Sequence, residues 1–171
     1  RYSTPRSGVA EYWYGYEASA SIVGNYLYIS ENGGMFYCVD LNTMELIWTQ
    51  DTKDDSNASP VFEPVGDDGG YIYTAPSLHW TKDHNNFGSV SVYKLDAITG
   101  QILWDTPFDV YTQEGVSGGV QSTPLLGKPG TTLAGTLFCS VSRTPDPDTG
   151  ILVALDAETG IEKWRYSLEY F

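Results

Sequence analysis

The stretch LDAITGQILW at residues 95–104 decides the fold, because the chain contains this pattern three times. Residues 155–164 read LDAETGIEKW, and residues 39–48 read VDLNTMELIW. In every copy the Trp follows the Asp by eight residues. Repetition of one pattern along a chain is the signature of a repeat architecture, in which each copy forms one structural unit.

Each copy of this pattern is typical of a β-hairpin. An apolar strand ends at the Asp, the chain turns, and a second strand runs to the Trp. The Asp side chain can accept hydrogen bonds from the turn amides, and Gly100 and Gly160 can adopt a positive φ. The Asp residues are Asp40, Asp96 and Asp156. The first copy carries Met44 instead of glycine, so we expect that turn to differ or to be strained, and its repeat to be the least regular.

Two further strands precede each hairpin. The first begins with small residues and continues with apolar ones, at residues 19–23, 59–62 and 122–126. The second begins at Gly or Asn and is rich in aromatic and apolar residues, at residues 25–29, 70–74 and 135–139. Four short antiparallel strands per repeat indicate twisted sheets stacked around a channel. We therefore predict an all-β fold of about three β-propeller blades; a β-sandwich is the alternative.

The repeat resembles that of pyrroloquinoline-quinone-type β-propellers, the quinoprotein dehydrogenase-like family. The LDAxTGxxxW pattern and the Ser-Pro and aromatic strands before it carry the resemblance, which covers about residues 19–168. It implies a ring of seven or eight blades, so the remaining blades would come from the same or another chain. It also implies that Trp48, Trp104 and Trp164 dock neighbouring blades, which we interpret as a scaffold role and not as ligand binding.

The repeats predict how one partial propeller domain is divided. We expect residues 1–18 to be the end of a preceding blade or a crossover, with Trp13 as the remnant of a further repeat. We then expect one blade at 19–50, a second with a long loop insertion at 51–106, and a third at 107–171.

Composition limits the class of partner. The formal net charge is −13, which disfavours binding to nucleic acid or to anionic lipid. No apolar stretch is long enough for a membrane span. Cys38 and Cys139 lie in apolar runs and are predicted to be buried free thiols. Acidity and the habit of the family favour an extracellular, cell-surface or periplasmic location.

The longest irregular segments are predicted to emerge on one side of the blades. They are residues 49–58, 76–88, 107–120 and 143–150, whereas residues 126–135 lie on the opposite side. Loops on one face of a repeat scaffold commonly carry binding residues. This face is therefore the candidate binding surface.

One loop of this face is chemically mixed. Its candidate binding residues are His79, Trp80, Asp83, His84, Asn85, Asn86 and Phe87. The two His lack the spacing of a convincing metal site, so no metal is predicted and a plain exposed loop is the default; binding of a sugar or peptide is the alternative. The acidic stretches at 51–55 and 67–68 are read as solvated loops, and residues 143–150 as a turn.

These observations favour a non-enzymatic propeller scaffold that presents a loop-rich face to a protein or glycan. No catalytic residue or cofactor is predicted. One alternative is a fragment of a quinoprotein dehydrogenase, which would use pyrroloquinoline quinone (PQQ) and calcium and hold its catalytic residues in other blades; the adjacent cysteines of alcohol-oxidising members do not occur here. Another alternative is an assembly factor of the cell envelope.

Overall fold

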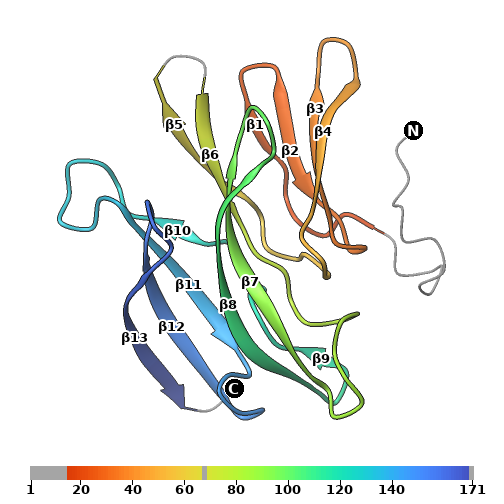
Figure 1. The fold of residues 1–171 in the computed structure, drawn as a ribbon, viewed down its shortest axis with the longest axis vertical. Helices are drawn as coiled ribbons and strands as arrows, with labels where there is room; N and C mark the ends of the chain where they lie inside the picture. Colours follow the sequence, from red (N-terminus) through yellow and green to blue (C-terminus); the bar gives the residue numbers. More distant parts are fainter. Residues whose placement is uncertain (1–14, 67–68, 170–171) are drawn as a thin grey trace.

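The computed structural model describes residues 15–66 and 69–169, which form three antiparallel sheets and no helix (Figure 1). The first sheet contains β1 (Ser21–Val23), β2 (Tyr26–Ser30), β3 (Met35–Asp40) and β4 (Glu45–Asp51). The second contains β5 (Val61–Val65), β6 (Gly69–Thr74), β7 (Phe87–Asp96), β8 (Ile102–Gln113) and β9 (Val116–Ser117). The third contains β10 (Leu125–Leu126), β11 (Thr136–Ser142), β12 (Thr149–Asp156) and β13 (Glu162–Glu169).

The sheets have the arrangement of propeller blades. In each one the strands follow one another in chain order, so every sheet is an antiparallel meander. Strand β5 contacts both β1 and β10, which makes these the inner strands. The three sheets stand beside one another in Figure 1. This confirms the predicted all-β partial propeller. Trp13 and the pair 67–68 lie outside the described residues.

Strand β8 is longer than the sequence indicated. Its pairing with β7 extends from Ile102 to Tyr111, so the expectation of an irregular segment from residue 107 onward was wrong. Phe108 and Val110 are buried while Pro107 and Asp109 are exposed, which is the alternation of a strand. Pro107 lies where β8 is the outer strand of its sheet, and there a missing N–H costs no ladder hydrogen bond. The strand thus crosses the boundary expected between residues 106 and 107.

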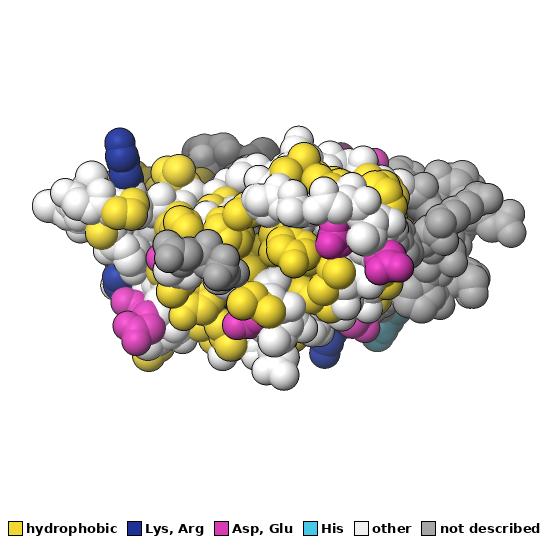
Figure 2. Space-filling model, turned by 90° about the horizontal axis from the view of Figure 1, so that it is seen from above, with side chains coloured by type: hydrophobic (Ala, Val, Ile, Leu, Met, Phe, Trp, Pro, Cys, Tyr) yellow, Lys and Arg dark blue, Asp and Glu magenta, His cyan; other side chains and the backbone are white. Residues whose placement is uncertain are grey.

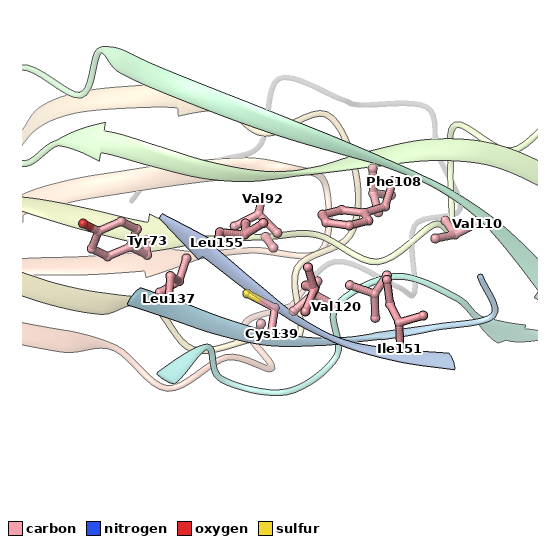
Figure 3. Close-up of a cluster of buried hydrophobic side chains, with 14 of the residues drawn as sticks. Tyr73, Val92, Phe108, Val110, Val120, Leu137, Cys139, Ile151 and Leu155 are labelled. Carbon is pink, nitrogen blue, oxygen red and sulfur yellow. The ribbon is translucent and has the colours of Figure 1, made fainter. Parts of the chain in front are cut away.

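Two apolar clusters fill the junctions between sheets. The cluster between the second and third sheets is shown in Figure 3. Cys139 belongs to it, and Cys38 belongs to the cluster between the first and second sheets. Both are free and buried, as predicted. Burial raises the pKa of Cys38 to about 11 and that of Cys139 to about 12, so both thiols stay protonated and unreactive at neutral pH.

The three Asp turns share one geometry. Asp96 Oδ1 accepts the N–H of Thr99 at 2.7 Å, and Gly100 closes the turn with φ 74°. The corresponding turn at Asp156 ends at Gly160 with φ 73°. Met44 takes the same position with φ 58°. The first turn therefore keeps its form and is strained, because a side chain in the left-handed region is unfavourable.

Each glycine of these turns lies under a Trp ring of the preceding sheet. A Cβ on Gly100 would be 2.5 Å from Cε3 of Trp48, and a Cβ on Gly160 would be 2.7 Å from Cδ2 of Trp104. Contacts this short cannot exist between real atoms, so the glycines are needed for the approach of the rings as well as for their φ.

We predict that Gly160→Ala is more harmful than Gly130→Ala. Both residues have a positive φ, but a Cβ on Gly130 would meet no atom within 4 Å. Gly130→Ala should lower the free energy of unfolding by about 1 kcal/mol through backbone strain alone. Gly160→Ala should lower it by about 1–3 kcal/mol more, because Trp104 must move. Urea unfolding measures both; equal losses would show that Trp104 does not need bare backbone beneath it.

Candidate functional site

The loops that join the strands on one side of the sheets form a connected surface. Ser77 N–H donates to Asp55 O at 2.7 Å, which links the β6–β7 loop to the β4–β5 connection. Leu78 N–H donates to Gly118 O at 2.7 Å. The next residue, Gly119, forms backbone hydrogen bonds with the third sheet. We call this side, at the bottom of Figure 1, the loop face.

The opposite side has another character. It carries the Asp turns and the connection at residues 127–135, as predicted. Figure 2 looks onto it and shows hydrophobic side chains gathered over its middle. Apolar residues exposed at these strand ends and turns include Ile22, Val65, Ile98 and Leu125.

A buried carboxylate organises the loop face. Asp54 is only 1% exposed. Its Oδ1 accepts the N–H groups of Asp55, His79 and Trp80 at 2.7, 3.0 and 2.8 Å. Its Oδ2 accepts the N–H and the hydroxyl of Thr81 at 3.0 and 2.6 Å. Five donors replace the water that the carboxylate loses on burial. The expectation that residues 51–55 form a solvated loop was therefore wrong for Asp54 and Asp55.

The first half of the candidate loop serves as an anchor. Leu78 is fully buried, so the expectation of a plain exposed loop was wrong there. His79 and Trp80 are half-buried, with their rings packed edge to face at a centroid distance of 4.2 Å. Trp80 Nε1 donates to Asn32 O at 2.5 Å, and His79 Nδ1 lies 3.3 Å from Ser117 Oγ. Both side chains thus hold neighbouring loops together.

The second half of the loop is an exposed tip. Asp83 Oδ1 accepts the N–H groups of Asn85 and Phe87 at 2.7 and 2.9 Å, which closes a tight turn. These backbone donors lower the pKa of Asp83, that of Phe87 most of all. Phe87 packs on Tyr111 with a centroid distance of 5.0 Å. His84, Asn85 and Asn86 are exposed and are the tip residues that face solvent.

Asp55 is the unusual ionisable group of the loop face. It is 7% exposed, and its Oδ1 has no hydrogen-bond partner among the described residues. Its Oδ2 lies 3.4 Å from Asn57 Nδ2 and 3.5 Å from Ser77 Oγ. Burial, with the nearby charges of Glu17 and Asp54, raises the pKa of Asp55 to about 7.

The described residues do not fit a calcium-bound quinone. Residues 15–66 and 69–169 contain no group of three His, Cys, Asp or Glu that could hold a metal ion. Both oxygens of Asp54 already accept hydrogen bonds, and Asp55 holds its proton through much of the range below neutral pH. His79 is part of the anchor whereas His84 lies on the tip, so the structure does not bring this pair together as ligands.

A groove lies beside Asp54, and the sequence did not allow it to be predicted. It has a volume of about 310 Å³. The polar residues that line it include Lys53, Ser89, Ser91 and Asp105. They come from the β4–β5 connection, which joins the first and second sheets, and from β7 and β8 of the second sheet. No local sequence pattern indicates that these segments lie together. Only the alternation of Ser89, Val90 and Ser91 signalled a strand with a polar outer side.

Two of the three predicted docking Trp residues lie at the junctions between sheets. Trp48 Nε1 donates to Ala97 O at 3.1 Å, and Trp104 Nε1 donates to Ala157 O at 3.3 Å. Trp164 has no such acceptor among the described residues and is 45% exposed.

Residues 86–170 match the family model described as outer membrane protein assembly factor BamB, a model of PQQ-type repeats. This part of the chain carries propeller repeats of the PQQ type. No curated protein matches the chain. Among solved structures, the chain is similar to the quinohemoprotein alcohol dehydrogenase from Comamonas testosteroni, at 21% identity and a TM-score of 0.62. This match covers 90% of the chain and 21% of that enzyme.

The chain is also similar to a europium-containing methanol dehydrogenase, at 18% identity and a TM-score of 0.59, over 91% of this chain and 26% of that one. The alcohol dehydrogenase ADHIIG from Pseudomonas putida HK5 matches at 17% identity with a TM-score of 0.54, over 86% and 26% of the two chains. The chain thus spans about a quarter or less of these proteins, and the likeness concerns the fold alone. Among the described residues no helix is long and apolar enough to cross a membrane.

We predict that Asp54→Ala detaches the anchor of the candidate loop. Without the carboxylate, the amides of His79, Trp80 and Thr81 lose their acceptor. Their hydrogen exchange should accelerate, and the free energy of unfolding should fall by about 3 kcal/mol. Asp109→Ala, at an exposed position of β8, is the control and should change neither. Unchanged exchange at these three amides in Asp54→Ala would contradict the role of Asp54.

We predict that Asp55→Asn removes a pH dependence of stability. The folded protein keeps the Asp55 proton up to a pKa of about 7, whereas an unfolded Asp loses it near 3.8. The contribution of this group to stability is therefore present at low pH and lost as the pH rises from about 4 to about 7. Asn cannot ionise.

We compare the free energy of unfolding of Asp55→Asn with that of the wild type at each pH. The variant's value minus the wild-type value should rise by about 1–3 kcal/mol from pH 4 to pH 8. Denaturant unfolding at several pH values measures this difference, and Asp109→Asn is the exposed control. A difference that does not change with pH would show that the Asp55 carboxyl is not held protonated.

Proposed function

We propose that this chain is part of a non-enzymatic propeller scaffold whose loop face binds a protein partner. The observation that carries the proposal is the anchoring of the β6–β7 loop by Asp54. Four hydrogen bonds to one buried carboxylate fix residues 79–81, whereas the tip at His84 and Asn85 is exposed. A loop held in place before binding loses less conformational entropy when a partner arrives.

The charge of the loop face favours a basic partner over a glycan. Its exposed carboxylates include Glu17, Asp83, Glu114, Asp146 and Asp148. Two of its cations are engaged within the face: Lys82 Nζ donates to His79 O, and Arg143 donates to Gln113 Oε1 and Pro147 O. A surplus of negative charge steers a positively charged segment toward this surface.

The family model supports the choice of a protein partner. Its description names an outer membrane protein assembly factor, and we infer that a factor of this kind contacts other proteins. We propose a location in the cell envelope or outside the cell, and we propose that further blades complete the ring.

Site-directed photo-crosslinking in the source cells tests this proposal. A photoreactive residue at position 84 probes the tip of the loop face, and the same residue at position 128 probes the exposed connection on the opposite side. We expect a discrete protein adduct from position 84 and none from position 128. Asp83→Lys with Asp146→Lys should weaken the adduct, because both reverse the charge of the face.

Adducts of equal yield from both positions would overturn the proposal of a binding face. A glycan array probed with the wild-type chain addresses the other ligand class. Glycan binding that is lost on His84→Ala, together with the absence of a protein adduct from position 84, would overturn the choice of a protein partner.

A further inference from the structure

The β7–β8 hairpin extends past the first sheet toward the loop face (Figure 1). Strands β7 and β8 have 10 and 12 residues, whereas β3 and β4 have 6 and 7. Tyr93 belongs to the apolar cluster between the first and second sheets and is buried. On the same face of β7, Ser91 is half-buried and Ser89 is exposed. The cover of the first sheet therefore ends at this point, and these three residues line the groove beside Asp54.

This groove is built from segments that are far apart in the sequence. The β4–β5 connection and the β6–β7 loop line it together with β7 and β8. Its volume of about 310 Å³ suits one long side chain of a partner. Its apolar lining includes Pro76, Val90 and Ile102, which can pack against a methylene chain.

The electrostatics of the groove favour a cation. Asp105 is exposed in it, and Asp105 Oδ2 accepts the hydroxyl of Ser91 at 3.3 Å. Burial raises the pKa of Tyr93, and the charges of Asp105, Asp51 and Asp54 add to this rise. Three carboxylates thus lie near the Tyr93 hydroxyl. Lys53 is the one cation among the described residues that line the groove, so negative charge prevails and attracts a positively charged group.

We propose that this groove receives an arginine side chain of the protein partner. A guanidinium presents five donors in a planar fork, so it can bond to the Asp105 carboxylate and to the hydroxyls of Ser89 and Ser91 together. A lysine ammonium is a compact point charge and matches such a spread of acceptors less well. The inference rests on the proposed function, because the arginine belongs to the partner of the loop face.

An NMR titration of the protein with N-acetyl-L-arginine amide tests the inference. We expect saturable shifts of the backbone amide signals of Lys53, Ser89 and Ser91. The corresponding citrulline compound has nearly the same shape and no charge, and the lysine compound has the charge without the fork. Both should bind at least about fivefold more weakly.

Three variants locate the binding. Asp105→Asn should weaken binding of the arginine probe about tenfold, because the carboxylate charge is lost while an oxygen remains for the Ser91 hydroxyl. Asp109→Asn is the matched control: it removes the same charge from an exposed residue on the same face of β8, outside the groove, and should change the affinity by less than about twofold. Ser89→Phe fills the groove from an exposed position and should abolish the shifts. Circular dichroism checks that all three are folded.

Several results would overturn the inference. Absence of shifts at the groove, or equal affinity for the arginine and citrulline compounds, would show that no guanidinium is recognised there. Equal losses in Asp105→Asn and Asp109→Asn would show that the charge of the whole face acts, and not the groove. Free L-arginine bound at least about tenfold more tightly than its capped amide would show a site for a free amino acid. The proposed function fails instead if position 84 gives no discrete adduct, and the titration does not depend on that adduct.

Discussion

The contact of a Trp ring with bare backbone is the constraint on which the rest of the molecule depends. A flat ring can lie on a turn only where no Cβ stands between them, so the sequence must supply glycine at positions 100 and 160. The ring also brings its N–H against the carbonyl of Ala97 or Ala157, and both Ala residues are buried. Burying the indole excludes water from that carbonyl, so the hydrogen bond and the apolar contact reinforce each other.

The two junctions share this plan but differ in their chemistry. In the first sheet the strand position beside Trp48 is Cys38, and in the second the position beside Trp104 is Lys94. Lys94 is buried, donates to Ala157 O at 2.9 Å and lies 3.7 Å from the centre of the Tyr71 ring. Burial lowers its pKa. The second junction thus satisfies a buried cation with a carbonyl and an aromatic face, whereas the first uses a neutral thiol.

How far the sequence predicts the structure depends on how local the determinants are. The hairpins and the Trp positions could be predicted because the Asp, the glycine and the alternating strands act within about ten residues of one another. The burial of Asp54 could not, because the donors to its carboxylate are backbone amides of residues 79–81 in the β6–β7 loop, and amides leave no mark in a sequence. The continuation of β8 through Pro107 could not be predicted for a related reason. A strand tolerates proline where it lies at the edge of a sheet, and the local pattern does not reveal which strand lies at the edge.

The two sides of the blades are under different demands. On the turn side, each Asp accepts amides of its own hairpin, so the polar groups are satisfied locally and the turn can repeat unchanged. On the loop side, buried oxygens lack partners among the described residues, including those of Ser30, Asn32 and Ser56. Such groups lower stability. The loop side thus joins its own loops through Asp54 and still leaves side-chain oxygens without partners among the described residues, whereas the turn side satisfies its carboxylates within each hairpin.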